Sequence, residues 1–189
     1  MEAIAAGNAS AEVTNLSDTI TKIVVTDKAD SSNINTYIIY TAEPAKEANI
    51  IDVSSLKEYK FKSVVASSEP QEDNKAINVL DGDLSTRWSA TVATSGEESI
   101  TLALDKAANA NCVAIAFYDG STRIAYFDLL VSADGKTWET IGEYDTSGAT
   151  DEYEYYDLGN RKVSHVKIVG YGTNTGNWVS ISDVKLYGK

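Results

Sequence analysis

The sequence predicts an all-β protein, built as an antiparallel sandwich or barrel. Most segments with a clear preference are short, rich in Val, Ile, Tyr and Thr, and bounded by Gly, Asn, Asp or Ser, which is the pattern of strands. Turn signals recur about every 8 to 12 residues, as in sandwiches and barrels. Helix signals are scarce, which argues against alternating β and α units.

Ten segments carry the strand pattern. An N-terminal pair of segments flanks the polar turn DKADSSNIN, and eight further segments follow. In chain order the ten are 19–27, 35–42, 60–68, 98–105, 112–119, 126–133, 137–144, 153–159, 165–172 and 181–188. The segments 126–133 and 137–144 form the clearest hairpin, because Asp134 and Gly135 favour the positive backbone angles of a tight turn.

Residues 1–48 are expected to be separate from a main domain at 49–189. A chain of 189 residues suits one well-buried domain and a smaller appendage. The segment AEPAKEAN, just after the N-terminal pair, has the composition of a linker. Two strands alone are marginally stable in water. They must therefore dock on the main domain, be the end of a preceding module, or pair with another chain.

The composition limits the partners and the compartment. Acidic residues outnumber Lys and Arg by 28 to 16, which disfavours nucleic acid as a partner. No apolar run approaches the ~18 residues that membrane insertion needs. The start MEAIAAGNAS lacks the features of a signal peptide. Cys112 is the single cysteine, so an internal disulfide is excluded, and its strand context predicts a buried small hydrophobe.

The residue inventory does not predict an enzyme. His165 is the single histidine, and no GxSxG motif accompanies it, so a serine triad is poorly supported. One histidine and one cysteine fall short of the usual zinc ligands. Acidic residues are abundant, but their spacing does not single out a general acid and a nucleophile. We therefore expect a non-catalytic protein.

The segment NVLDGDLSTRWSA, residues 78–90, is rich in oxygen ligands. Asp81, Asp83 and Thr86 lie around Gly82, which lets the backbone bend so that carbonyl oxygens can join them, and such a set suits calcium. An EF-hand is excluded, because the twelfth residue counted from Asp81 is Val92 rather than glutamate. The alternative is a turn in which the Asp and Thr side chains bond their own backbone.

Three blocks in order resemble one known family. They are NVLDGDLSTRWSA, FYDGSTRIAYFDLLVSADGKTWETI and GYGTNTGNWVSISDVKLYG. Together they resemble the discoidin, or coagulation factor V/VIII type C, domain, whose bacterial branch includes the family 32 carbohydrate-binding modules. The resemblance covers about residues 52–189. It implies a jelly-roll β-sandwich of the galactose-binding-domain-like kind, here with a short N-terminal β appendage.

The resemblance also implies one structural calcium ion that ties an early loop to the last strand. Carried over by position, the ligands are the side chains of Asp81, Asp83, Thr86 and Asp183 and the main-chain carbonyls of Asn78 and Ser182. The family commonly has glutamate where this chain has Asp183, so the reach of that ligand is shorter by one methylene. Trp88 is expected to lie in the core beneath the loop.

Sugar binding is implied at loops on one end of the sandwich. Arg123 offers a planar fork of donors for sugar hydroxyls or a uronic carboxylate. Trp178 lies in a loop rich in Gly, Asn and Thr, where an exposed ring can stack on a pyranose. Asn174 and Asn177 could add hydrogen bonds. The pattern is similar to modules attached to alginate and related polysaccharide lyases.

The function predicted from these features is a non-catalytic, calcium-stabilised carbohydrate-binding module. Its ligand would be a polysaccharide or glycan, either a uronic acid polymer or a galactose-type sugar. The resemblance places it outside a bacterial cell or on its surface, covalently linked to a polysaccharide-degrading enzyme or a surface module. The alternative is an extracellular adhesion or assembly subunit, in which the sandwich is a scaffold and the N-terminal strands pair with a neighbour.

Overall fold

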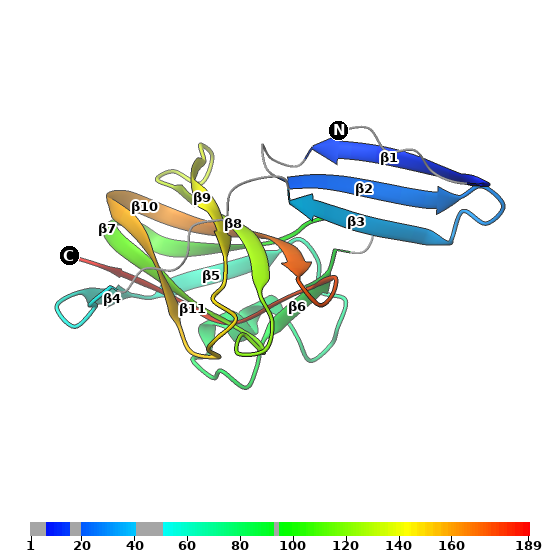
Figure 1. The fold of residues 1–189 in the computed structure, drawn as a ribbon. Coiled ribbons are helices and arrows are strands. Elements are labelled where there is room, and N and C mark those ends of the chain that lie inside the picture. The colour runs from blue at the N-terminus through cyan, green and yellow to red at the C-terminus, as the bar shows by residue number, and fades with distance from the viewer. Residues whose placement is uncertain (1–6, 16–19, 41–50, 93–94) are drawn as a thin grey trace.

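The computed structural model describes residues 7–15, 20–40, 51–92 and 95–189, which form an almost entirely β molecule (Figure 1). Its elements are β1 (Ala9–Asn15), β2 (Ile20–Asp27), β3 (Ile34–Tyr40), β4 (Lys57–Tyr59), β5 (Phe61–Ala66), the short 3₁₀ helix η1 (Ala76–Leu80), β6 (Trp88–Thr91), β7 (Glu98–Phe117), β8 (Ala125–Ser132), β9 (Glu139–Asp145), β10 (Glu154–Thr173) and β11 (Trp178–Gly188). No helix within the described ranges is long and apolar enough to cross a membrane.

The N-terminal appendage is a three-stranded antiparallel sheet in the order β1-β2-β3. Val13 pairs with Ile23, which in turn pairs with Tyr37, so apolar residues line up across one face. The sequence predicted only two strands, because the Ala, Ser, Glu and Asn residues of β1 have low strand propensity. Figure 1 shows this sheet to one side of the sandwich, and Lys22 Nζ donates a hydrogen bond to the Ser95 carbonyl.

The linker predicted at AEPAKEAN, and with it the boundary between 48 and 49, lies outside the described residues. The division of the chain into 1–48 and 49–189 therefore stays a prediction.

Two long strands, β7 and β10, connect the layers of the sandwich. Each has 20 residues, and they pair with each other along most of their length. Residues 100–104 of β7 pair with β5, whereas residues 110–117 pair with β11. Because one strand serves both layers, the eight strands are hydrogen-bonded as one sheet folded over its own core, in the path β4-β11-β7-β10-β8-β9 with β5 and β6 beside it. The predicted β-sandwich is confirmed.

Each long strand was predicted as two shorter ones. The segments 98–105 and 112–119 are joined in β7, and 153–159 and 165–172 are joined in β10. The sequence between them, such as KAANAN, has weak strand propensity and resembles a break. In the fold, the ladder continues through these segments with register shifts near Gly159 and Asn160, both of which have positive φ. Irregularities of this kind bend a strand without ending it.

The hairpin β8–β9 is confirmed, but its turn is longer than the tight turn predicted. Six residues, 133–138, separate the two strands. Gly135 has the expected positive φ of 73°. The Asp134 carboxylate accepts hydrogen bonds from the backbone N–H groups of Lys136 and Thr137, both at 2.8 Å, which stabilises the wider turn.

The core lies between the layers. Trp88 is fully buried, as predicted, and its Nε1 donates a hydrogen bond to the Ser68 carbonyl at 2.9 Å. Phe127 lies at the centre of an aromatic cluster, with ring centroids 5.0 Å from Phe117 and 5.3 Å from Tyr156. Cys112 is buried and free, also as predicted. This packing fixes the loop after η1 and the start of β11, which carry the candidate site.

Candidate functional site

The loop that follows η1 is held by its own acidic side chains. The Asp81 carboxylate accepts hydrogen bonds from the Asp83 N–H at 2.8 Å and the Thr86 hydroxyl at 2.7 Å. The Asp83 carboxylate accepts from the hydroxyl and the N–H of Ser85, and these bonds lower the pKa of Asp83. Gly82 provides the bend with φ of 77°. The loop therefore gathers three of the predicted ligand residues in one tight turn.

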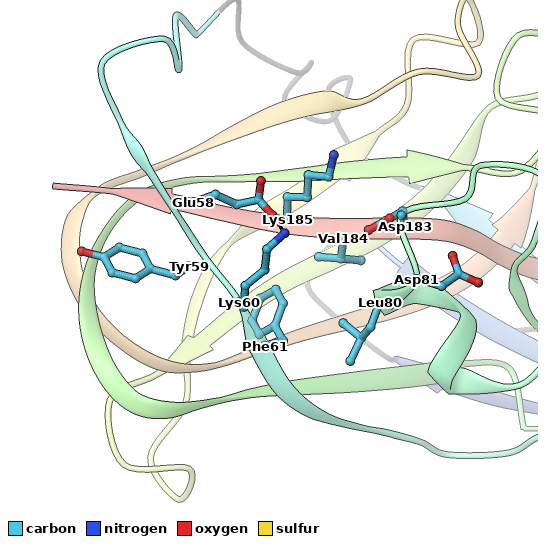
Figure 2. A pocket seen from close by; sticks show the side chains of 10 residues that line it. Glu58, Tyr59, Lys60, Phe61, Leu80, Asp81, Asp183, Val184 and Lys185 are labelled. Atoms are coloured by element: carbon cyan, nitrogen blue, oxygen red, sulfur yellow. Dashed lines mark hydrogen bonds and ion pairs between the residues drawn. The ribbon is translucent and has the colours of Figure 1, made fainter.

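The last strand brings a buried carboxylate to this loop. Asp183, on β11, is 2% exposed, and its Oδ2 atom has no hydrogen-bond partner among the described residues. A Cβ placed on Gly82 would lie 3.8 Å from that oxygen, so the unpaired atom faces the backbone of the loop. Figure 2 shows Asp183 on β11 beside the loop that carries Asp81. Burial raises the pKa of Asp183, against the opposing effects of the Lys185 charge, the Val184 N–H and Tyr153, and the nearby charge of Asp81 adds a small further increase.

These residues border a single pocket, which we call the carboxylate pocket. It is lined by Glu58, Tyr59, Lys60, Phe61, Leu80, Asp81, Gly82, Asp183, Val184 and Lys185 (Figure 2). Lys60 is already paired with Glu58, so its charge is partly compensated within the pocket wall. The wall therefore contains a buried, unpaired carboxylate oxygen close to a second carboxylate.

The donor set fits a hard cation. An unpaired buried carboxylate oxygen is costly, and a calcium ion is bound by carboxylate, carbonyl and hydroxyl oxygens. Among the described residues, no three His, Cys, Asp or Glu side chains are grouped closely enough to hold a metal by themselves. The set predicted from the sequence does not require such a group, because main-chain carbonyls complete it.

The two residues predicted to offer carbonyl ligands lie next in sequence to the lining of the carboxylate pocket, Ser182 directly before Asp183 and Asn78 two residues before Leu80. Ser182 is buried and lies at a register shift of β11, between the pairs that Ile181 and Asp183 make with β7. A bulged residue of this kind is left out of the regular ladder. The Asn78 side chain donates to the carbonyls of Asp73 and Arg87, both at 2.9 Å, and so fixes both ends of the loop.

A second pocket contains both of the main predicted sugar ligands. Arg123, from the loop after β7, and Trp178, the first residue of β11, line a hollow of about 170 Å³. This volume is below the roughly 300 to 1,000 Å³ of drug-sized ligand sites, so the hollow is small and suits one sugar residue or a single charged group. The complete lining is Gln71, Arg87, Ser89, Tyr118, Arg123, Trp178 and Ser180, and we call it the arginine pocket.

The indole of Trp178 is available to a ligand. The residue is 38% exposed, whereas Trp88 is fully buried. β11 pairs here with β6, with Trp178 opposite Thr91, so the ring is carried by a regular strand. An aromatic ring held in this way on a rigid element can stack on the apolar face of a sugar.

Arg123 is held firmly by its own loop. Its Nε and Nη2 atoms both donate to the Tyr118 carbonyl, at 3.1 and 2.8 Å. Nη2 also lies 3.6 Å from a carboxylate oxygen of Asp119. The guanidinium is 5.6 Å from the centroid of the Tyr118 ring. Arg123 therefore shapes the pocket wall as well as lining it.

The predicted asparagines do not line the arginine pocket. The Asn174 carboxamide accepts a hydrogen bond from the Ile124 N–H at 2.9 Å, and the Asn174 N–H donates to the Ile124 carbonyl. The Asn177 carbonyl accepts from the Val92 N–H at 2.8 Å. Both residues join neighbouring loops, and a contact of either with a sugar stays a prediction.

Arg87 and Tyr118 were not singled out from the sequence. Arg87 follows Thr86 directly and precedes the core residue Trp88, so the motif that contains it was interpreted through its neighbours. Its guanidinium carbon lies 3.7 Å from the centroid of the Tyr118 ring, a close cation–π stack. The signal that could have identified it is charge, since it is one of only three arginines in an acidic chain.

Comparisons with known proteins agree with this architecture. The family model of the F5/8 type C domain matches residues 63–184. No curated protein matches the sequence. Among solved structures, the chain is similar to the family 32 carbohydrate-binding module of AlyQ in complex with 4,5-unsaturated mannuronic acid, at 29% identity and a TM-score of 0.65, covering 70% of this chain and 99% of that one.

Two further structures extend the likeness. A pectin-binding carbohydrate-binding module is 28% identical with a TM-score of 0.63, covering 68% of this chain and 91% of that one. The family 32 module of NanJ from Clostridium perfringens, in complex with galactose, is 17% identical with a TM-score of 0.56, covering 67% and 93%, and shows the fold alone. The jelly-roll fold is thereby confirmed, as is the expectation of a non-catalytic module.

Proposed function

Because the chain belongs to the F5/8 type C domain family, we propose that it binds a polysaccharide or glycan in the arginine pocket. The observation that carries this proposal is the meeting of Arg123 and Trp178, which lie 55 positions apart in the sequence (178 less 123), in the lining of one hollow. A fork of donors beside an exposed aromatic ring can bind hydroxyls and stack on a sugar at the same time.

The sugar is either a uronic acid polymer or a galactose-type residue. The AlyQ module is solved with an unsaturated mannuronic acid, and the second relative is described as pectin-binding. Both ligands are uronates, and these two relatives are nearly 30% identical to the chain. Binding is expected to be weak to moderate, because a shallow site buries little surface and must order flexible sugars.

Calcium is the proposed structural cofactor. Asp81, Asp83 and Thr86 from the loop would hold it together with Asp183 from β11, and the carbonyls of Asn78 and Ser182 would complete the set. The unpaired Asp183 Oδ2 supports this assignment. When bound, the ion supplies only positive charge, and by binding the folded form it stabilises that form. The loop and the last strand are thereby tied together.

The setting of the module is proposed from the same relatives. AlyQ joins a family 32 module to an alginate lyase domain, and the present chain spans 33% of that two-domain structure. We infer that this chain likewise belongs to a larger extracellular bacterial enzyme or surface protein. Its part would be to keep the attached module close to an insoluble or viscous polysaccharide.

A second candidate function rests on the N-terminal sheet. β3 is an edge strand, and its Ile34 and Tyr37 are exposed. Edge strands with apolar side chains can pair with another chain, as an adhesion or assembly subunit would require. Deletion of residues 1–48 separates the two functions. A shortened protein that stays folded and binds glycan supports the module, whereas loss of assembly without any glycan binding supports adhesion.

The central test is the substitution Trp178→Ala. We expect its affinity for the best ligand among alginate, polygalacturonate and galactan to fall at least ~10-fold, which corresponds to about 1.4 kcal/mol. The melting temperature should stay within about 2 °C, because the ring is partly exposed. Isothermal titration calorimetry and thermal melting measure the two quantities.

Trp138→Ala is the matched control. Trp138 lies outside the arginine pocket and contacts His165 edge-on, with ring centroids 6.2 Å apart. The Trp138→Ala variant should bind glycan with the same affinity as the native chain. If the native chain and Trp178→Ala bind glycan with equal affinity, the sugar site lies outside the arginine pocket.

A further inference from the structure

The arginine pocket is a local exception to the charge of the chain. The formal net charge is −12, yet the pocket lining contains two of the three arginines and no acidic residue. Among the described residues, Asp119 is the one acidic side chain within ion-pair distance of either arginine, and it pairs with Arg123 rather than with Arg87. A cationic lining in an acidic chain points to an anionic group on the ligand.

The two arginines of the pocket are not equivalent. Arg123 directs two of its three nitrogen atoms to the Tyr118 carbonyl, has Asp119 as a counter-charge, and has a side chain only 20% exposed. These contacts hold the loop and partly neutralise the guanidinium. Arg123 is therefore suited to position the wall of the pocket.

Arg87 has a different environment. Its guanidinium lies over the Tyr118 ring at 3.7 Å, and none of the described residues makes a hydrogen bond or an ion pair with that group. A stacked guanidinium keeps its plane fixed while the N–H groups around its edge stay available. The main chain of Arg87 is also fixed, because its carbonyl accepts from Asn78 Nδ2 at 2.9 Å.

We propose that Arg87 binds the carboxylate of a uronic acid residue and makes the pocket select acidic sugars over neutral ones. This inference rests on the proposed function and names the substrate class of the same site. The fork geometry of a guanidinium matches a carboxylate, and hydrogen bonds between charged groups are about twice as strong as neutral ones. Trp178, in the same lining, would stack on the ring that carries the carboxylate.

A purely structural role of Arg87 makes a different prediction. If Arg87 served only to hold Tyr118 in place, its loss would distort the pocket for every ligand. Acidic and neutral sugars of the same shape would then lose affinity equally. A ligand pair that differs only in the charge of the carboxyl group therefore separates the two roles.

The test uses oligogalacturonate and oligomannuronate, each as the free acid and as the neutral methyl ester. Calorimetry gives the affinity of each form for the native chain and for Arg87→Gln. We expect the native chain to bind the better free acid at least ~10-fold more tightly than its ester, with a preference that weakens as salt rises. In Arg87→Gln the affinity for the free acid should fall to that for the ester, while the affinity for the ester stays within about twofold of the native value.

Arg161→Gln is the control for net charge. It removes the same charge from an arginine that is paired with Glu139 and does not line the arginine pocket. It should leave all four affinities unchanged. Melting curves of both variants should match the native curve, which excludes unfolding as the cause of any loss.

Several results would overturn the assignment, and they are distinguishable. Equal loss of acid and ester in Arg87→Gln would make Arg87 a structural residue. Equal binding of acid and ester by the native chain would also contradict selection by charge. Binding of galactan but of no uronate would overturn this inference and leave the proposed function standing. Binding of no glycan at all would overturn both.

Discussion

The carboxylate pocket and the arginine pocket are built from the same two segments but have opposite chemistry. The loop after η1 supplies Asp81 to the first and, through Arg87, a guanidinium to the second. β11 supplies Asp183 to the first and Trp178 to the second. Within the part of the chain that the structure describes, the carboxylate pocket has a buried oxygen without a hydrogen-bond partner, whereas the arginine pocket has a half-buried guanidinium without a counter-charge.

This difference separates stability from recognition. A buried unpaired anion costs free energy in the fold, so its natural complement is a resident cation. A partly exposed cation is still solvated, so leaving it without a counter-charge costs little folding free energy. It is therefore available to an anionic ligand. We therefore expect changes at the carboxylate pocket to affect unfolding first and changes at the arginine pocket to affect binding first.

The largest expected effect is that of removing calcium. If calcium is present at about 100 times its dissociation constant, its loss should lower the free energy of unfolding by about 2.7 kcal/mol. For a chain of this size that corresponds to a fall in melting temperature of about 5 to 10 °C. Calorimetric melting in calcium and in a chelator measures the difference. Identical melting curves would show that no stabilising calcium ion is bound in the carboxylate pocket.

Asp183→Asn sharpens this test. The variant should melt at the same temperature with calcium and with chelator. In chelator it should be at least as stable as the native chain, because an amide carries no charge and so avoids the cost of the unpaired carboxylate. A variant that is less stable than the native chain in chelator would show that Lys185, the Val184 N–H and Tyr153 stabilise the carboxylate by more than its burial costs.

Asp128 provides an internal comparison for Asp183, and its expected effect is smaller. Asp128 also has a buried oxygen, Oδ1, to which none of the described residues donates a hydrogen bond, while its Oδ2 accepts from the Tyr171 hydroxyl at 2.8 Å. Burial raises the pKa of Asp128 from 3.8 to about 6, and the charges of Glu143 and Glu97 add to the increase against the opposing Tyr171 bond. It does not line the carboxylate pocket, so a proton rather than a metal should relieve it.

The sign of the pH effect follows from this raised pKa. Between pH 4 and 6 the folded chain keeps a proton on Asp128 that the unfolded chain has lost, so the free energy of unfolding falls as the pH rises. The contribution is complete below about pH 4 and lost by about pH 6. The pKa difference corresponds to about 3 kcal/mol, which solvent screening of this partly exposed carboxyl group reduces to about 2 kcal/mol. Urea unfolding in metal-free buffer should show this loss, and Asp128→Asn should lack it. A native curve parallel to that of Asp128→Asn would contradict it.

The sequence predicted the fold class well because strand alternation and turn residues are local signals. The hairpin at Asp134 and Gly135 and the core position of Trp88 are examples. Continuity of β7 through KAANAN was not predictable, because it depends on pairing with β10 rather than on local propensity. β1 was missed for the same reason, since its ladder with β2 compensates for weak strand formers.

The candidate site was only partly accessible from sequence. Family resemblance led to Arg123 and Trp178, which do line one pocket, but Asn174 and Asn177 lie outside its lining. Arg87 was overlooked because two features that the sequence does not show single it out. These are the missing counter-charge and the stacking of its guanidinium on the Tyr118 ring. Partners that are absent cannot be inferred from a one-dimensional pattern.

The smallest expected effect is a coupling between the two pockets. Because Trp178 and Asp183 share β11, and Arg87 follows Thr86 in the loop, loss of calcium should free two of the sugar-binding side chains. Ordering them again on binding costs about 0.5 to 1 kcal/mol, so glycan affinity should fall about two- to fivefold in chelator. Linkage requires that glycan raise the affinity for calcium by the same factor.

Two calorimetric titrations measure this coupling independently, one of glycan with and without calcium and one of calcium with and without glycan. Agreement between the two factors would show that the metal positions the sugar site. In Asp183→Asn, which should lack bound calcium, the glycan affinity should not respond to chelator, and this variant controls for calcium bound by an acidic polysaccharide itself. If the native chain binds glycan equally in both conditions, β11 is rigid without the metal, and the two pockets act independently despite their shared segments.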